Sequence, residues 1–397
     1  MENTLADDLA QELLQHCLAG SPFPERLLDQ LLESDHSRAL FRIVVERLAD
    51  LFEPRLCGVY ADLFTEIIAR RIPDLHAEHL LARYERVRRR RKLDRDPAAI
   101  RNVFVLSRVT LGADVAITSI VLNAAKQAFS NAKIYFVGPQ KAWELFAADP
   151  RLNHIAIAYG RSATLDDRLS IWPSLRETMC KPASIVIDPD SRLTQLGLLP
   201  ICPEEDYYFF ESRSYGGDSD APLSVLTRSW VAETFGVADA RPYIYTGVDA
   251  TEIATTVSFG VGENPAKRVP DPFEEELLRH LPRPVLIDRG GGGEEADRVE
   301  RAVARAGPGV AMWDGSFAGF AAHIQRSHLY VGYDSAGGHV AAACGVPLVS
   351  IFAGFASERM FQRWRPTGPG QIHVVRPSGD VQALITQIVK LAQDLLA

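Results

Sequence analysis

The sequence lacks the motifs that identify several large classes of enzyme. No GxxxxGK[ST] segment is present, which excludes a P-loop nucleotide-binding protein. Gly260 and Gly262 could begin a dinucleotide-binding fingerprint, but Pro265 stands where the third glycine belongs, which excludes a nicotinamide or flavin enzyme on this segment. The five cysteines form no CxxC pair and no cluster with histidine, which favours a reduced, cytoplasmic protein without structural zinc.

From the sequence we also expect no signal peptide, no membrane span and no nucleic-acid partner. Residues 1–20 are acidic and lack the basic start of a signal peptide. The uncharged stretch 340–356 contains Pro347 and fits a helix followed by a strand better than a membrane span. The formal net charge of −8 argues against nucleic acid as a partner. The 397 residues, 47% of them hydrophobic, are enough for two or three globular domains.

Residues 1–96 are predicted to be helical throughout. Leucines repeat at helical spacing, as at Leu5, Leu9 and Leu13, and prolines separate several such stretches. The helical part ends in a run rich in arginine, residues 83–96. This run fits a solvated helix end before a linker. It also fits a contact with an anionic membrane surface or a phosphorylated acceptor.

Strands and helices alternate in two series after residue 102. The first series begins with the apolar run 103–106 and the second with 257–259, and helical patterns separate the later strands of each. Such alternation predicts parallel βαβ units. Two successive series predict an α/β protein with two doubly wound domains and a ligand cleft between them.

The most informative stretch runs from Ser327 to Gly354. A strand at 329–331 is followed by a predicted glycine turn at 334–338, a short helix at 341–344 and a buried strand at 348–352. A glycine turn that opens a helix after a strand presents free backbone N–H groups and the positive helix end, which suit phosphate. An N-cap in a tight connection is the purely structural alternative.

The segment from Asp334 to His339, with the alanine-rich helix and Gly345-Val346-Pro347 after it, resembles the donor motif of the bacterial heptosyltransferases, glycosyltransferase family 9. The usual pattern is Asp-Ser/Thr-Gly-x-x-His, and Ala336 replaces its first glycine here. The resemblance implies the GT-B architecture, in which two Rossmann-like domains face each other across a cleft. The helical spacing predicts a helical domain at 1–98, and the resemblance implies an acceptor domain at 99–250 and a nucleotide-sugar donor domain at 251–397.

Three further residues match the family in the same order. The resemblance implies that Lys267 neutralises the donor diphosphate without a metal, with Arg268 as the adjacent alternative. It implies a ribose contact for Glu294, although acids at a helix N-terminus are also ordinary stabilising residues. It makes Asp114 the general base, with an N-cap as the alternative, although Ala113 is inserted in the family's Gly-Asp-Val.

The predicted catalytic residue is thus Asp114, and the predicted donor-binding residues are Lys267, Glu294, Asp334, Ser335, Ala336, Gly337, Gly338 and His339. The resemblance implies an inverting transferase that moves a sugar to a hydroxyl acceptor and uses no metal or other cofactor. By family analogy the donor is ADP-heptose and the default acceptor belongs to lipopolysaccharide. The extra helical part favours another acceptor, a protein or another glycan, lipid-linked glycans included.

Two other functions stay open. One is a GT-B enzyme that uses a UDP- or GDP-sugar. The other is a non-catalytic scaffold that acts through its helical part. The expected location is the cytoplasm, and the arginine-rich run leaves open a peripheral contact with the inner membrane.

Overall fold

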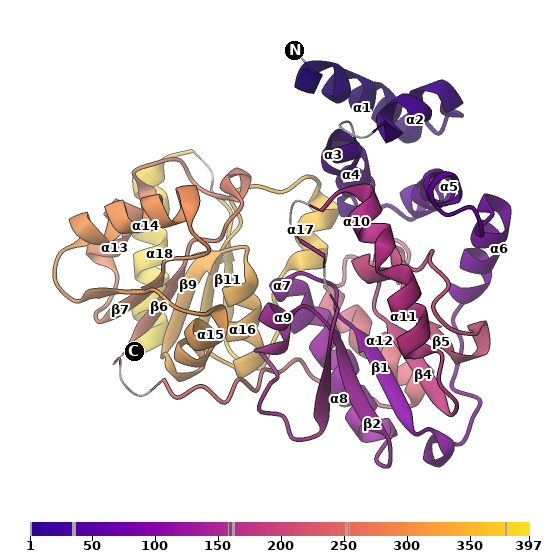
Figure 1. Ribbon diagram of the computed structural model, residues 1–397. Coiled ribbons are helices and arrows are strands. Elements are labelled where there is room, and N and C mark those ends of the chain that lie inside the picture. Colours follow the sequence, from indigo (N-terminus) through magenta and orange to yellow (C-terminus); the bar gives the residue numbers. More distant parts are fainter. Residues whose placement is uncertain are drawn as a thin grey trace.

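The computed structural model contains two parallel β-sheets, each flanked by helices (Figure 1). It describes residues 2–33, 37–157, 159–160, 163–250, 253, 255–377 and 379–397. We call the five-stranded sheet with its helices the first unit and the six-stranded sheet with its helices the second unit. The predicted α/β class with two doubly wound halves is confirmed. The predicted domain limits stay predictions, and the one at 250/251 adjoins residues outside the described part.

The first unit is built on a sheet with the strand order β3-β2-β1-β4-β5. Its strands are β1 (Asn102–Leu106), β2 (Lys133–Gly138), β3 (Leu152–Ala156), β4 (Ser184–Asp188) and β5 (Tyr207–Phe209). Side chains alternate between the faces of a strand, so Phe104 and Leu106 enter one hydrophobic cluster and Val103 and Val105 enter another. Both faces are therefore covered, as parallel sheets require.

The connections of the first unit are mostly helical. They comprise α7 (Leu111–Ala113), the π-helical turn η3 (Asp114–Thr118), α8 (Ser119–Ala128), α9 (Gln140–Trp143), α10 (Leu165–Ser170), α11 (Trp172–Met179), the short turns η4 (Arg192–Thr194) and η5 (Glu204–Asp206), and α12 (Leu223–Phe235). This series agrees with the alternation expected from the sequence.

The second unit has the strand order β11-β10-β9-β6-β7-β8, all parallel. Its strands are β6 (Val257–Gly260), β7 (Val285–Asp288), β8 (Val310–Trp313), β9 (Leu329–Tyr333), β10 (Leu348–Ile351) and β11 (Ile372–Val375). Its helices are η6 (Pro265–Lys267), α13 (Phe273–His280), α14 (Gly293–Ala306), α15 (Phe317–Arg326), α16 (Ala336–Cys344), α17 (Glu358–Trp364) and α18 (Val381–Leu396). In both units the chain reverses direction across the sheet beside the first strand, which is where doubly wound folds bind ligands.

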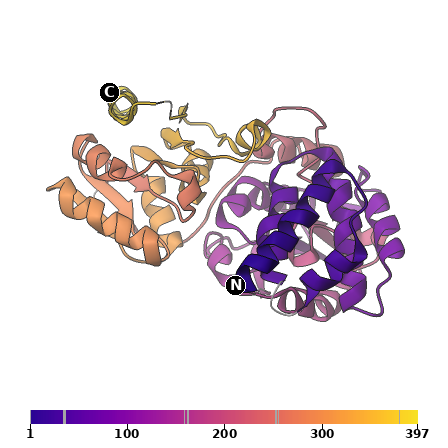
Figure 2. The same cartoon turned by 90° about the horizontal axis from the view of Figure 1, so that it is seen from above.

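The N-terminal part is helical, as predicted. It comprises α1 (Glu2–Ala19), α2 (Glu25–Leu32), α3 (Ser37–Ala39), the π-helical turn η1 (Leu40–Val45), α4 (Glu46–Asp50), α5 (Pro54–Arg71) and α6 (Ala77–Val87), and we call it the helical segment. Figure 2 shows the helical segment lying over the first unit, with the second unit to one side.

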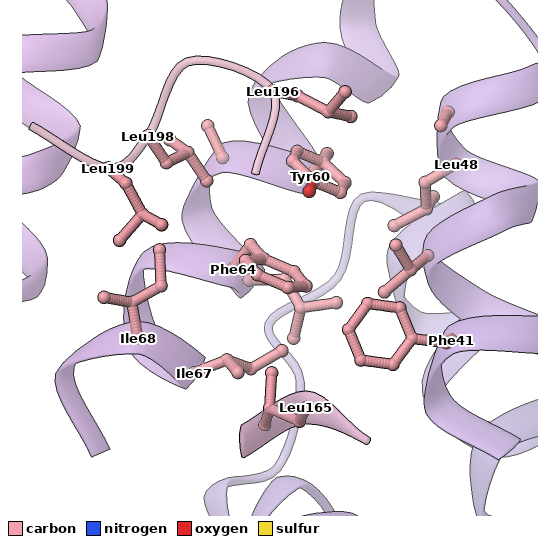
Figure 3. Close-up of a cluster of buried hydrophobic side chains, with 14 of the residues drawn as sticks. Phe41, Leu48, Tyr60, Phe64, Ile67, Ile68, Leu165, Leu196, Leu198 and Leu199 are labelled. Atoms are coloured by element: carbon pink, nitrogen blue, oxygen red, sulfur yellow. The ribbon is translucent and has the colours of Figure 1, made fainter. Parts of the chain in front are cut away.

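The helical segment shares a hydrophobic core with the first unit. Phe64 and Tyr60 on α5 are fully buried and stack with ring centroids 5.2 Å apart. They lie against Leu196 and Leu198 from the chain between β4 and β5 (Figure 3). Fully burying a side chain of this kind contributes about 1.5–3 kcal/mol. The helices therefore belong to the same packed body as the first sheet.

The arginine-rich run 83–96 pairs with the first unit. Arg86 contacts Glu204 through two hydrogen bonds of 2.9 and 2.7 Å, and Arg88 contacts the buried Glu211 at 2.9 Å. Four more arginines of the run donate hydrogen bonds to the first unit: Arg83 to Gly197 O, Arg90 to Glu233, Arg91 to Glu205 O and Arg95 to Asp206. Most arginines of the run are thus paired with the first unit, while Arg86 and Arg90 are still exposed. None of the described helices combines the length and apolar character needed to cross a lipid bilayer.

Helix α17 of the second unit packs against the rest of the molecule. Arg359 donates from Nε to Phe52 O, and Arg363 donates from Nη1 to Tyr215 O at 2.9 Å. The ring of Trp364 meets the ring of Phe52 edge to face at 6.1 Å. Through these contacts α17 touches both the helical segment and the first unit.

Candidate active site

The start of α16 differs from the sequence expectation. The helix begins at Ala336, so Gly337 and Gly338 are helical and do not form a turn. Gly337 is required for close packing, because a Cβ there would lie 2.2 Å from Tyr330 Oη. Only Asp334 and Ser335 connect β9 to the helix. The predicted free N–H groups therefore belong to the first turn of α16 itself.

Lys267 and Asp334 form an ion pair at the carboxyl edge of the second sheet, with 2.5 Å between Nζ and Oδ2. Lys267 ends η6, and this turn is fixed by Asn264, whose side chain accepts from Ala266 N. The side chain of Lys267 is 25% exposed and that of Asp334 only 7%. The lysine is therefore close to the start of α16 and still reachable from solvent.

Ser335 is the N-cap residue of α16, but its hydroxyl makes no capping bond. Ala336 lies against the first unit, since a Cβ built on Gly112 would be 3.4 Å from its Cα. These two residues bring the start of α16 next to α7. We use the term "junction" for the place where α7, α16 and α17 come together with residues 50–52.

His339 is packed inside the junction. It is buried, its ring lies 5.8 Å from that of Trp364, and its Cδ2 would be 3.3 Å from a Cβ on Gly112. Burial lowers the pKa of His339 to about 4, so the ring is neutral near pH 7. In this arrangement His339 is an uncharged aromatic spacer between the two units.

Glu294 lies at the start of α14 and is exposed. Its carboxylate contacts Arg268 Nη1 at 2.8 Å. The Arg268 guanidinium is buried and also donates to the carbonyls of Gly262 and Glu263. Arg268 is therefore the anchor of the loop that carries Lys267, and Glu294 is attached to that loop through Arg268.

Asp114 is fully buried at the start of the π-helical turn η3. Its carboxylate accepts from Ser107 Oγ at 2.7 Å, Arg108 N at 2.8 Å and Thr118 Oγ1 at 2.7 Å. Burial raises the pKa of Asp114 to about 6, and these hydrogen bonds oppose part of the increase. The N-cap alternative does not hold, because Thr110 precedes α7 and Asp114 lies inside the helical run.

The π-helical turn explains how the inserted Ala113 fits. A π turn accommodates one more residue than an α turn and occurs within α-helices, frequently at functional sites. Here it starts directly after Ala113 and places Asp114 and Thr118 in hydrogen-bonding contact. The carboxylate consequently faces the turn after β1.

Two arginines of the first unit were not predicted from the sequence. Arg108 follows β1 and donates from Nη1 to Pro189 O at 2.9 Å and to Ser212 Oγ at 2.5 Å. Arg192 lies in η4 after β4 and is partly exposed. Both follow strands at the carboxyl edge, a position that a sequence search for charged residues after β-runs could have found.

The structure thus brings most of the predicted site together. Gly112, Ala336 and His339 touch across the two units, and Lys267 and Asp334 pair directly beside them. Asp114 belongs to the same turn as Gly112, but its carboxylate faces away from solvent. Among the described residues no group of three His, Cys, Asp or Glu side chains is arranged to hold a metal ion.

Comparison with known proteins agrees with the resemblance. Residues 314–382 match the sequence model of glycosyltransferase family 9 (heptosyltransferase). The chain is 19% identical to the family 9 glycosyl transferase from Veillonella parvula DSM 2008, with a TM-score of 0.54 over 76% of this chain and 98% of that one. No curated protein matches the chain in sequence.

A second similar structure is the heptosyltransferase WaaC of E. coli with ADP-2-deoxy-2-fluoro heptose. It is 17% identical, with a TM-score of 0.53 over 75% of this chain and 100% of WaaC. At such identities the structures show the fold. The predicted GT-B architecture and family resemblance are confirmed, and the predicted enzyme class, a glycosyltransferase, is that of the matching family.

Proposed function

We propose that this protein transfers a sugar from a nucleotide-diphosphate donor to a hydroxyl acceptor. The observation that carries the proposal is the Lys267–Asp334 ion pair at the start of α16. It couples a solvent-accessible cation to the N-terminus of a helix, and this is a suitable seat for a diphosphate. Asp334 and α16 also lie inside the stretch that matches the family model.

In the proposed reaction the acceptor oxygen forms a bond to the anomeric carbon. The bond from that carbon to the diphosphate oxygen breaks, and its electron pair leaves with the nucleoside diphosphate. Lys267, the hydroxyl of Ser335 and the N–H groups at the start of α16 stabilise the negative charge that develops there. The positive charge of Lys267 takes the place of a metal ion in this proposal.

The acceptor hydroxyl must also lose its proton. The resemblance assigns this step to Asp114, and the assignment stays a prediction. A pKa of about 6 suits a base that works near neutral pH. However, the carboxylate is inaccessible and already accepts three hydrogen bonds, so one of these would have to be exchanged for the acceptor hydroxyl.

ADP-heptose is the proposed donor. The matching family model is described as heptosyltransferase, and the similar WaaC structure contains an ADP-heptose analogue. A cell-envelope glycan or a protein is the proposed acceptor class, and the cytoplasmic location stays a prediction. The scaffold alternative is disfavoured, because the helical segment shares its core with the first unit and is not a separate module.

Calorimetric titration with ADP, UDP, GDP and ADP-heptose tests the donor site. We expect selective binding of the adenine compounds, and we expect Lys267→Ala to weaken it at least tenfold, which corresponds to about 1.4 kcal/mol. Lys390→Ala is the matched control, because Lys390 is an exposed lysine on α18 of the same unit.

Three results would change the proposal. A preference for UDP or GDP would keep a nucleotide-sugar transferase and discard the heptose. Equal affinity in Lys267→Ala and Lys390→Ala would remove Lys267 from the site. A folded chain that binds no nucleotide would contradict the proposed function as a whole.

A further inference from the structure

The turns after β1 and after β4 each hold a non-glycine residue in the left-handed region of backbone space. Val109 has a φ of +72° and Asp190 a φ of +68°. Such a conformation is strained, above all for a β-branched residue, and persists only where the surrounding structure enforces it. The two turns also touch, because Ser191 Oγ donates to Ser107 O. Two strained turns are therefore held side by side at the carboxyl edge of the first sheet.

The turn after β1 supplies two of the three hydrogen bonds that the Asp114 carboxylate accepts. We call residues 107–109 the β1 turn. Arg108 N donates to Oδ1 at 2.8 Å and Ser107 Oγ donates to Oδ2 at 2.7 Å. Val109 N donates to Ser107 Oγ at 2.8 Å, so this hydroxyl accepts one hydrogen bond and donates the other to Asp114. The position of the carboxylate therefore depends on the conformation of the β1 turn.

Asp190 holds the β1 turn through the side chain of Arg108. The carboxylate of Asp190 is buried, and its Oδ2 lies 3.7 Å from Arg108 Nη1. Ser212 Oγ bridges the two, since it accepts from Arg108 Nη1 at 2.5 Å and donates to Asp190 Oδ2 at 2.9 Å. Arg108 is thus tied to the turn after β4 by its side chain and to Asp114 by its backbone N–H.

Arg213 connects Asp190 to the helical segment. Its guanidinium is buried, and Nε donates to Asp190 Oδ2 at 3.1 Å. Within the described part of the chain, its Nη1 and Nη2 have no hydrogen-bond partner. The guanidinium lies over the ring of Tyr60 on α5, with Cζ 5.0 Å from the ring centroid. The position of Arg213 therefore depends on Asp190 and on a helix of the helical segment.

A second link to the helical segment runs through Glu211. Its Oε1 lies 4.0 Å from Arg213 Nη2 and accepts from Tyr84 Oη on α6. Its Oε2 accepts from Arg88 Nη2, at the end of α6, at 2.9 Å. Both α5 and α6 thus contact the buried charges that hold the β1 turn.

We propose that Asp190 is a positioning residue for the proposed reaction, which holds the β1 turn in place for Asp114 with the support of the helical segment. The inference rests on the proposed function and keeps Asp114 as its base. The acceptor hydroxyl must replace one of the three donors on the Asp114 carboxylate, so the other donors have to keep the carboxylate in place during the exchange. Arg108 N can do this only while the β1 turn keeps its strained conformation.

The test compares Asp190→Asn with Asp149→Asn in the full-length chain. Asparagine keeps the size of the side chain and, like aspartate, tolerates a positive φ. Asp149 is the matched control, because it is also a buried aspartate of the first unit in an ion pair. The hydrogen bonds of its carboxylate come from Lys126, Arg151 and Tyr243 and not from the β1 turn.

The measurements separate turnover from donor binding and from folding. ADP release from ADP-heptose, with water as the acceptor, gives kcat and KM. Calorimetric titration with ADP gives the Kd and the number of binding sites, by which kcat is divided. Thermal unfolding measures the stability of each variant.

We expect Asp190→Asn to lower kcat at least tenfold, because a misplacement of about 1 Å can cost on the order of 100-fold. The KM for ADP-heptose and the Kd of ADP should change less than about twofold, since the proposed donor residues belong to the second unit. Asp149→Asn should leave kcat within about twofold of the wild type, although both variants lose a buried ion pair and should be less stable.

Two further variants test the route through Arg108. Ser212→Ala removes the hydroxyl that bridges Arg108 and Asp190 and leaves both charges in place. It should lower kcat about threefold at unchanged ADP affinity, and it disturbs folding less than the loss of a buried charge. Arg108→Gln combined with Asp190→Asn should be no slower than the slower single variant, because Asp190 acts through Arg108.

The support from the helical segment is tested at Tyr60. Tyr60→Leu removes the ring under the Arg213 guanidinium, whereas Tyr60→Phe keeps the ring and removes only the hydroxyl. Tyr60→Phe should therefore retain more of kcat than Tyr60→Leu, at equal ADP affinity. Equal kcat in these two variants would remove the helical segment from the proposal.

Equal kcat per binding site in Asp190→Asn and Asp149→Asn overturns the inference. Wild-type kcat in Ser212→Ala, or additive losses in the double variant, does the same. An Asp190→Asn chain that loses ADP affinity as much as it loses kcat would make Asp190 a structural residue. A wild-type chain that binds no ADP, or releases none from ADP-heptose, contradicts the proposed function instead, so the two failures are distinguishable.

Discussion

Asp114 and Asp334 each follow an inner strand of their own sheet. Asp114 starts the turn η3 in the helical run after β1, and Asp334 directly follows β9. Asp114 is fully buried and accepts hydrogen bonds from two hydroxyls and one backbone N–H. Asp334 pairs with one lysine that is partly exposed.

The difference separates a structural carboxylate from an exchangeable one. A buried carboxylate with three short-range donors is costly to disturb, because each donor loses its partner. A partly exposed ion pair is held weakly and can open when a stronger anion such as a diphosphate approaches Lys267. The same residue type after an inner strand therefore supports the fold in one unit and leaves a ligand position in the other.

The largest expected effect is on stability at pH 5. Asp114→Ala should lower the free energy of unfolding by about 3–4 kcal/mol, because it leaves three buried donors unpaired at about 1 kcal/mol each and creates a cavity. Asp334→Ala should lower it by about 1 kcal/mol. Urea titration of both variants measures the difference, and equal losses would show that the two carboxylates do not differ as described.

A second effect of nearly the same size depends on pH. Burial raises the pKa of Asp114 from 3.8 to about 6, so the folded state holds the proton that the unfolded state releases at lower pH. The raised pKa of Asp114 contributes about 3 kcal/mol to the free energy of unfolding. This contribution is fully present well below pH 3.8 and is lost as the pH rises through about 6.

Asp114→Asn has no such titration. The stability advantage of the wild type over this variant should therefore shrink by about 2.4 kcal/mol between pH 4 and pH 7. Asp188 and Asp288, whose pKa values burial also raises to about 6, titrate in both proteins and cancel in the difference. A difference that does not change with pH would mean that Asp114 is ionised throughout this range.

The smallest effect concerns two glycines. Gly337→Ala should cost about 2 kcal/mol, because the new Cβ would lie 2.2 Å from Tyr330 Oη inside the second unit. Gly112→Ala should cost about 0.5 kcal/mol, because its Cβ would meet His339 Cδ2 across the junction at 3.3 Å, where small adjustments suffice. Thermal unfolding of the two variants measures the order, and the reverse order would show that the junction is the more rigid of the two places.

Much of the fold could be predicted from the sequence, because its signals are local. The strands predicted from the apolar runs 103–106 and 285–287 each differ from the observed strand by one residue. Glycines and prolines marked most connections. The start of α16 was placed too late, because Gly337 and Gly338 suggested a turn and the close approach of Tyr330 could not be seen in the sequence.

The site could be predicted in part. Lys267 and Asp334 were singled out by residue type and order in the chain, and they meet in the structure. The burial of Asp114 could not be predicted, because it depends on a π turn and on hydroxyls from two elements.

The packing of α5 also sets an order of events during synthesis. Phe64 leaves the ribosome well before Leu196 and Leu198, the residues that cover it. At about 5–20 residues per second the delay is on the order of ten seconds. Throughout that time the part of the helical segment that Leu196 and Leu198 cover has no partner within the chain. A nascent chain stalled before residue 196 should consequently be the species that binds chaperones or aggregates.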